Sequence, residues 1–186
     1  RPHGVWGFSV GSAMNLLTGI ACYAAIAKAE GGPLQWPGHP GFYGRLYQMI
    51  DVDLLARAME WTATTPGAAN NAFNITNGDL FRWEHVWLRI ADFFDMEAGA
   101  PAPVKISDAM SDKGALWDRM VSEHGLKPHK LDEIVNWAYL DMALNNDMDQ
   151  VSSLTKIVST GWTDLWDTQK TITRQLQKLR DDRIIP

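Results

Sequence analysis

One stretch of the chain places its apolar side chains at the spacing of a helix. Six of them recur at positions i, i+3, i+4, i+7, i+8 and i+11: Trp83, Val86, Trp87, Ile90, Ala91 and Phe94. In an α-helix, residues at these offsets lie on one side, so the stripe can pack against a core. The pattern therefore predicts a helix over about residues 82–94.

Two more helices follow from the apolar pattern and its boundaries. Residues 13–29 are rich in Ala, Leu and Ile on every side, which predicts a helix buried in the core. Gly31, Gly32 and Pro33 end it, because glycine and proline disfavour continued helix. A further helix is predicted to end near Thr64 and to begin at Asp51 or Asp53, either of which can cap its first turn.

The rest of the chain also predicts more helix than strand. Helices are expected over about 107–124, 131–146, 150–159 and 164–182, and a turn of helix over 45–50. Strand signals are limited to residues 1–6, 34–36 and 72–76. So few strands do not make a complete α/β sheet, and this imbalance indicates part of a larger α/β fold.

Composition excludes several classes of protein. The net charge is −5 and no basic stripe is present, so nucleic acid is not an expected partner. No apolar run reaches the length of a membrane span, and residues 13–29 come nearest. The lone Cys22 rules out an internal disulfide and fits a reducing compartment, here taken as the cytoplasm. Most of the nine tryptophans are expected to fill the core.

Two candidate sites are rejected on their spacing. Gly38, Gly41 and Gly44 mimic a dinucleotide fingerprint, but that motif needs a full strand before the glycines and a helix after them. Residues 37–44 are therefore interpreted as a loop. His124 and His129 are too few for zinc, which usually has three or four clustered ligands, and no metal site is predicted.

The most specific motif is the opening RPHGVWGFS, residues 1–9. Proline fixes φ at Pro2, and Gly4 and Gly7 permit close approach to the backbone. The segment resembles the Arg-Pro-x-x-(Ile/Val)-(aromatic)-Gly segment of extended short-chain dehydrogenase/reductases. In that family it leaves a central strand at its carboxyl end, beside the nicotinamide, where open α/β sheets bind ligands.

Further segments resemble one group of that family, the progesterone 5β-reductase/iridoid synthase-like enzymes. They are RPHGVWGFSVGSAMN (1–15), FNITNGDLFRWEHVWLRIADFF (73–94), LDEIVNWAYLDMALN (131–145), Gly161-Trp162 and KLRDDRIIP (178–186). Each piece is weak alone, but together they cover nearly the whole chain in order.

The resemblance implies the fold class and the domain organisation. The fold class is α/β, and this chain is the C-terminal, mostly helical substrate-binding part of an extended Rossmann-type short-chain reductase, without the N-terminal sheet and fingerprint. Residues 1–30 would form a strand end, a cofactor-side loop and a helix, and residues 31–186 the substrate-binding lobe. The missing N-terminal half is then an expected partner, as is a second copy of the chain in a homodimer.

The resemblance also implies a reaction. Such an enzyme takes hydride from NADPH and delivers it to the C=C bond of an enone, a small hydrophobic carbonyl substrate, while a tyrosine hydroxyl stabilises the developing enolate. The Tyr-x-x-x-Lys pair of the family is absent, since no tyrosine here is followed four residues later by lysine. No catalytic residue is therefore assigned, and this chain alone is expected to be inactive.

Binding residues can be carried over by position. Cofactor contacts are expected first at the nicotinamide end and then near the phosphate and ribose: Pro2, His3 and Val5, followed by Ser12 and Met14. Substrate contacts are expected at Gly4, Tyr139 and Met142. Relatives often carry a polar side chain where Gly4 stands, so its missing side chain widens the expected pocket.

Two other functions remain open on sequence alone. The chain can belong to another extended short-chain enzyme, such as a ketoreductase or a sugar-nucleotide epimerase or dehydratase. The lack of an obvious Arg/Lys cluster for a diphosphate disfavours a sugar nucleotide. It can also be a non-enzymatic lobe that binds proteins.

Overall fold

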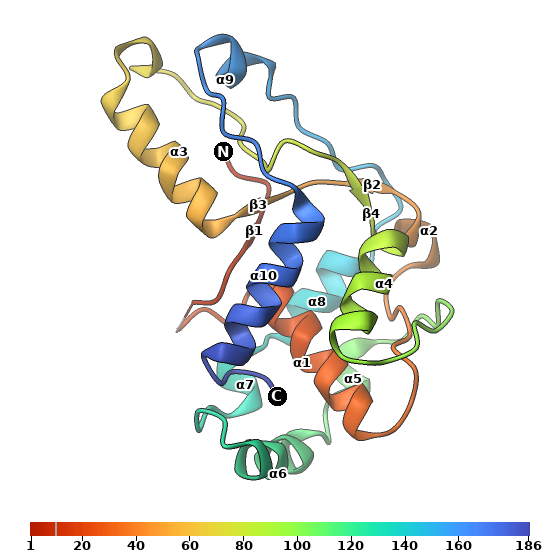
Figure 1. Cartoon of the computed structure of the whole chain (residues 1–186). Helices are drawn as coiled ribbons and strands as arrows, with labels where there is room; N and C mark the ends of the chain where they lie inside the picture. Colours follow the sequence, from red (N-terminus) through yellow and green to blue (C-terminus); the bar gives the residue numbers. More distant parts are fainter. Residues whose placement is uncertain (10) are drawn as a thin grey trace.

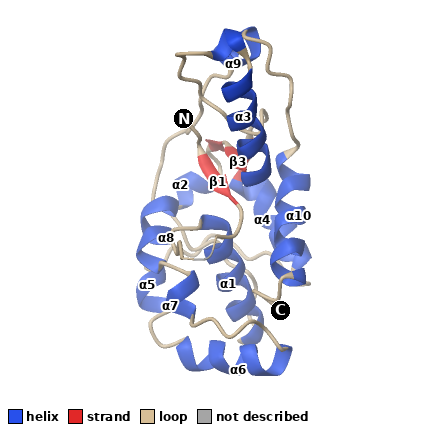
Figure 2. Cartoon of the chain, turned by 90° about the vertical axis from the view of Figure 1, so that its left-hand side faces the viewer, coloured by secondary structure: helices blue, strands red, loops and turns tan. Residues whose placement is uncertain are grey.

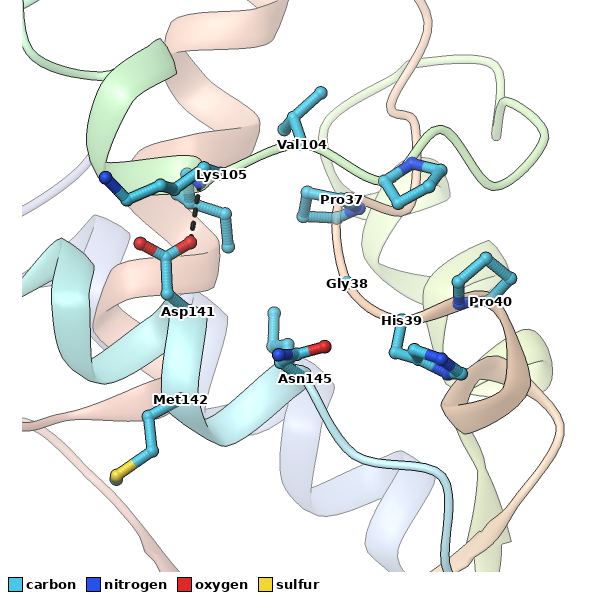
Figure 3. A pocket seen from close by; sticks show the side chains of 12 residues that line it. Pro37, Gly38, His39, Pro40, Val104, Lys105, Asp141, Met142 and Asn145 are labelled. Atoms are coloured by element: carbon cyan, nitrogen blue, oxygen red, sulfur yellow. Dashed lines mark hydrogen bonds between the residues drawn. The ribbon is translucent and has the colours of Figure 1, made fainter.

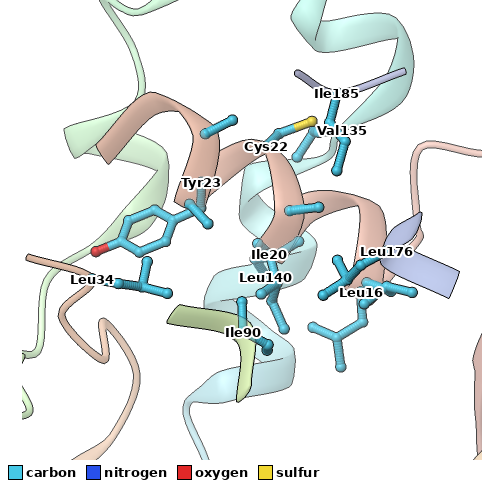
Figure 4. Close-up of a cluster of buried hydrophobic side chains, with 14 of the residues drawn as sticks. Leu16, Ile20, Cys22, Tyr23, Leu34, Ile90, Val135, Leu140, Leu176 and Ile185 are labelled. Atoms are coloured by element: carbon cyan, nitrogen blue, oxygen red, sulfur yellow. The ribbon is translucent and has the colours of Figure 1, made fainter. Parts of the chain in front are cut away.

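The central helix of the molecule is the one predicted to be buried. The computed structural model describes residues 1–9 and 11–186. Helix α1 (Leu16–Ala29) is buried from Leu16 through Ile26. Figure 4 shows it surrounded by side chains from distant segments: Leu34, Ile90, Val135, Leu140, Leu176 and Ile185. Helix α1 is apolar on every side because other segments of the chain pack around it.

Two other helices also match the sequence pattern. Helix α4 (Trp83–Phe93) buries the predicted stripe. Helix α3 (Val52–Thr64) begins after Asp51, whose side chain accepts a hydrogen bond from the Asp53 backbone N–H. The predicted cap is thus confirmed at the first of its two candidates.

The later helices are shorter than predicted. The segment 107–124 divides into α5 (Ile106–Ala109) and α6 (Gly114–His124), and 131–146 into α7 (Leu131–Ile134) and α8 (Trp137–Leu144). Asn136 divides the second pair, because its side chain accepts from the Tyr139 N–H and caps α8. Helices α9 (Thr155–Ser159) and α10 (Thr168–Asp181) also begin later than expected.

The strands form two small pairs. Strand β1 (Gly4–Trp6) runs parallel to β3 (Met49–Asp51), and β2 (Leu46–Tyr47) runs antiparallel to β4 (Phe81–Arg82). The helical turn predicted over 45–50 is wrong, because these residues pair as strands. The predicted strands at 34–36 and 72–76 reduce to isolated bridges, Leu34 with Ala98 and Pro2 with Ile75. Residues 37–44 include a short helix, α2 (Pro40–Tyr43).

The paired strands β1 and β3 separate two apolar clusters. Figures 1 and 2 show α3 and α9 at one end of the molecule and α1 with α5–α8 at the other. The smaller cluster, between α3 and α9, contains Ile50, Leu54, Phe73, Ile157 and Trp162, and the larger one surrounds α1. The strands thus lie where both clusters support them.

Most of the tryptophans and the single cysteine lie in the core. Six of the nine tryptophans are buried, as expected: Trp6, Trp36, Trp83, Trp87, Trp117 and Trp162. Cys22 is fully buried, and burial raises the pKa of its thiol. No helix in the described ranges, 1–9 and 11–186, is long and apolar enough to cross a membrane.

Candidate substrate and cofactor face

The opening segment forms a strand with one exposed and one buried side chain. Val5 is 39% exposed, whereas Trp6, the next residue, is completely buried. Strand β3 is the one strand neighbour of β1 within the residues described. The alternation leaves the Val5 side chain accessible while Trp6 anchors the strand in the core.

Gly4 faces the hydroxyl of a buried tyrosine. A methyl group added at Gly4 would lie 2.9 Å from the Tyr47 hydroxyl oxygen and 3.6 Å from the indole nitrogen of Trp6. Tyr47 is only 7% exposed. The space left by the missing side chain of Gly4 is therefore bordered by two polar groups.

His3 joins the same group of side chains. Its ring meets the Tyr47 ring edge-on with 5.3 Å between centroids, and its Nδ1 lies 3.3 Å from the Ser152 hydroxyl. Partial burial lowers the pKa of His3, which favours the neutral imidazole. His3 thus connects β1 to the loop that follows α8.

Tyr139 lies on helix α8. It is partly buried against the large apolar cluster, and its backbone N–H is bonded to Asn136. Burial, and next the proximity of Tyr139, raise the pKa of Tyr47 to about 12. We call His3, Gly4, Trp6, Tyr47 and Tyr139 the Tyr47 cluster. Two of the three residues predicted to bind substrate, Gly4 and Tyr139, belong to it.

The residues predicted to meet the cofactor are accessible. Pro2 and Ser12 are exposed, and Met14 is 65% exposed. Pro2 bridges to Ile75 through the backbone of its neighbours. None of these side chains is used to fill the core, so all remain free to contact a bound molecule.

The start of α1 differs from the sequence prediction. The helix begins at Leu16, not near residue 13, because Asn15 caps it by accepting from the Thr18 N–H. Ser12 therefore lies upstream of the helix N-terminus. Packing explains why residue 7 is glycine. A methyl group there would lie 2.4 Å from a Val52 side-chain carbon, at the start of α3.

Met142 lies apart from the Tyr47 cluster. It is 68% exposed and lines a cavity of about 550 Å³ between the end of α8, the loop after Pro37 and the segment Pro103–Ile106 (Figure 3). The carboxylate of Asp141 accepts hydrogen bonds from the Ile106 and Ser107 N–H groups, at 2.6 and 3.1 Å. Asp141 thus caps α5 and supports the wall of the cavity.

The glycine pattern at 37–44 is explained by packing. Added methyl groups at Gly38 and Gly41 would lie 2.7 Å from the Leu144 carbonyl oxygen and 2.1 Å from an Asp147 carboxylate oxygen. These glycines let the loop pack closely against the end of α8. The rejection of a dinucleotide fingerprint here agrees with this packing.

Sequence reasoning did not identify Tyr47. Leu46-Tyr47-Gln48-Met49-Ile50 is a short apolar run with one polar residue, which is consistent with a buried strand and would have placed Tyr47 in a sheet. The described part of the chain holds no cluster of three or more His, Cys, Asp or Glu side chains suited to a metal ion.

Comparison with known proteins extends the resemblance over the whole chain. The chain is 39% identical to the (S)-8-oxocitronellyl enol synthase of Antirrhinum majus and 36% identical to the (S)-8-oxocitronellyl enol synthase of Nepeta cataria, each over 189 residues. Each alignment covers 100% of this chain but only 49% and 48% of the relative. The chain therefore spans about half the length of the curated relatives it matches. No protein-family model matches it.

Solved structures show the same partial coverage. The Bordetella bronchiseptica enzyme WbmG, in complex with NAD and UDP, matches with a TM-score of 0.56 and 17% identity, over 100% of this chain and 44% of its own. The Thermus thermophilus UDP-glucose 4-epimerase, in complex with NAD, matches with a TM-score of 0.53 and 16% identity, over 97% and 45%. These structural matches confirm the predicted fold class, and the sequence relatives confirm the resemblance to the iridoid synthase-like group.

Proposed function

We propose that this chain, which has the fold of the C-terminal, mostly helical part of an extended short-chain reductase, is the substrate-binding half of an NADPH-dependent enzyme that reduces the C=C bond of an enone. The observation that carries the proposal is at the Tyr47 cluster: Gly4 of the opening motif faces the buried Tyr47 hydroxyl, whose pKa is raised by burial and then by Tyr139 of α8. The similarity to (S)-8-oxocitronellyl enol synthases supports it.

The cofactor side is assigned to the accessible residues of the opening segment. NADPH supplies the hydride in such a reaction. Pro2, His3 and Val5 would contact the nicotinamide end, and Ser12 and Met14 the phosphate and ribose region. The exposure of Val5 and Met14, at 39% and 65%, supports this assignment, because both side chains are accessible to a bound molecule.

The substrate side is assigned to the partly apolar face beside β1. Gly4 and Tyr139 would contact a small hydrophobic carbonyl compound there, and Met142 would contact it from the cavity at the end of α8. Trp6 and Tyr47, beside Gly4, are buried, and a hydrogen bond to a developing charge would be stronger beside such side chains than in water. The tyrosine and lysine that complete the reaction in this family would come from the other half of the protein.

Activity measurements test the proposal directly. The full-length protein should oxidise NADPH in the presence of small α,β-unsaturated aldehydes or ketones, whereas residues 1–186 alone should not exceed the buffer background. A full-length protein that interconverts UDP-hexoses but leaves every enone unchanged would replace this proposal with the epimerase alternative. Turnover by the isolated chain would contradict the assignment of the catalytic residues to the other half.

A structure of the full-length protein with NADP bound tests the cofactor residues. Pro2, Val5 and Ser12 should lie within direct or single-water contact of the cofactor. If all three lie more than about 6 Å from it, the assignment of the opening segment is wrong.

A further inference from the structure

The ring of Tyr47 is held firmly by its neighbours. Tyr47 lies on β2, opposite Phe81 of β4. Its ring centroid is 5.6 Å from that of Phe42, 5.5 Å from that of Phe81 and 5.7 Å from that of Trp83. Packed aromatic side chains have few alternative rotamers, so the direction of the Tyr47 hydroxyl is fixed.

The hydroxyl end of Tyr47 points at Gly4. The ring is buried, and the hydroxyl oxygen lies 2.9 Å from where a methyl group on Gly4 would stand. The indole nitrogen of Trp6 borders the same space, and it is buried without a hydrogen-bond partner among the described residues. Buried polar groups nearly always have partners, so this unsatisfied donor requires an explanation.

A carbonyl group bound beside Gly4 would supply a partner. An oxygen placed beside Gly4 could accept from the Tyr47 hydroxyl, and a side chain at position 4 would block it. The phenol is suited to donate, because burial, and then the proximity of Tyr139, keep its pKa near 12 and the hydroxyl protonated.

We infer that the Tyr47 hydroxyl binds the substrate by hydrogen bonding, in the space that a polar side chain at position 4 would otherwise fill. The pair Gly4 and Tyr47 then determines which carbonyl compounds fit beside β1. This inference rests on the proposed function and adds a specificity residue to it. Tyr47 acts by binding and positioning; the hydride and the catalytic tyrosine come from elsewhere.

Removing the hydroxyl while keeping the ring is the first test. In the full-length protein, Tyr47→Phe should lower kcat/KM for the preferred enone by about tenfold, the value of one hydrogen bond. The KM for NADPH should stay within about twofold, because the cofactor is not the partner. Tyr43→Phe is the matched control: it removes a phenol from a half-buried ring that packs on Trp36, outside the Tyr47 cluster, and should leave kcat/KM unchanged.

The second test supplies a hydroxyl from position 4 in place of the one removed from Tyr47. Tyr47→Phe removes the atom that a side chain at position 4 would meet, so Gly4→Ser becomes compatible with the fold in that background. The double variant should recover several-fold of the lost kcat/KM, and Gly4→Ala with Tyr47→Phe should not. A difference between serine and alanine at the same position reports the hydroxyl and not the packing.

The outcomes separate this inference from the proposed function. Tyr47→Phe with kcat/KM within twofold of wild type on every enone tested, or equal recovery with alanine and serine, would overturn the role of Tyr47 and leave the reductase assignment intact. A wild-type full-length protein that oxidises no NADPH with any enone would overturn the proposed function, and this inference with it.

Discussion

Asp51 shows how one carboxylate can connect three elements. It is fully buried at the end of β3, and it accepts hydrogen bonds from the Asp53 N–H, from Arg174 at 2.6 Å and from the Gln175 amide at 2.9 Å. The backbone N–H of Asp51 is bonded to the Asn77 side chain at 2.8 Å. A buried carboxylate is tolerated only with such partners, so Asp51 fixes α3 and α10 to the end of the sheet.

Substituting Asp51 should therefore cost much more stability than substituting its neighbour. Asp51→Ala leaves Gln175 and the α3 N-terminus without a partner, and should lower the free energy of unfolding by about 3–5 kcal/mol. Asp53→Ala removes an exposed ion pair with Arg174 and should cost about 0–1 kcal/mol. Urea unfolding of the full-length proteins, followed by tryptophan fluorescence, measures both. Equal midpoints for the two variants would show that Asp51 is not a structural centre.

Single residues of the candidate site were only partly predictable from sequence. Gly4 was identified because it stands inside a specific motif at the chain's opening. Tyr139 was identified through the resemblance of its helix. Tyr47 was not, because its role depends on pairing with a strand 34 residues later, which a local pattern does not report. The contact between Tyr47 and Gly4 forms only in the folded chain, because the two residues are far apart in the sequence.

At the scale of elements, the apolar stripes predicted helices better than their ends. Helix α4 has a stripe with no competing cap inside it, and it was predicted within a residue or two. The segment 131–146 was predicted as one helix, although Asn136 supplies a cap in its middle. Side-chain capping competes with helix continuation, and only the surrounding packing decides which prevails.

The close contact between helices α1 and α8 predicts that an alanine at Gly19 lowers the stability of the protein. A methyl group at Gly19 would lie 2.4 Å from a Leu140 side-chain carbon, in a buried contact. Overpacking costs about 1–3 kcal/mol, which exceeds the helix-propensity gain of about 1 kcal/mol, so Gly19→Ala should destabilise the protein.

The matched control for this prediction is Gly114, at the start of α6. An added methyl group there meets nothing within 4 Å, so Gly114→Ala should be neutral or stabilising by up to about 1 kcal/mol. Thermal unfolding of the two variants shows whether each substitution raises or lowers the melting temperature. A stabilised Gly19→Ala variant would mean that Leu140 can move aside.

At the scale of the whole molecule, the core contains many packed aromatic rings, and two of them are the phenol rings of buried tyrosines. Tyr23 lies beside Trp87, and Tyr47 beside Trp83. Burial raises the pKa of both, from 10.0 to about 12, with smaller contributions from Glu30 at Tyr23 and from Tyr139 at Tyr47. Both hydroxyls must therefore stay protonated in the folded molecule at a pH where they ionise in the unfolded chain.

This difference predicts the direction of alkaline destabilisation. The stabilising contribution is fully present below the ordinary pKa of 10.0, and it is lost as the pH rises through about 12, because the unfolded state releases its protons first. Urea midpoints measured from about pH 9 to about pH 11.5 should fall, and the double variant Tyr23→Phe with Tyr47→Phe should show a flatter decline. A decline of unchanged slope in the double variant would assign the effect to other groups.

The single strand neighbour of β1 has a consequence for handling the chain. Within the described residues the second edge of β1 is unpaired, and an unpaired edge presents N–H and C=O groups to any extended peptide. Residues 1–186 produced on their own would therefore tend to self-associate through this edge. The affinity of this association is limited, because β1 has only three residues. Co-expression with a segment that supplies the neighbouring strand should raise the yield of monodisperse protein more than any change to the helices.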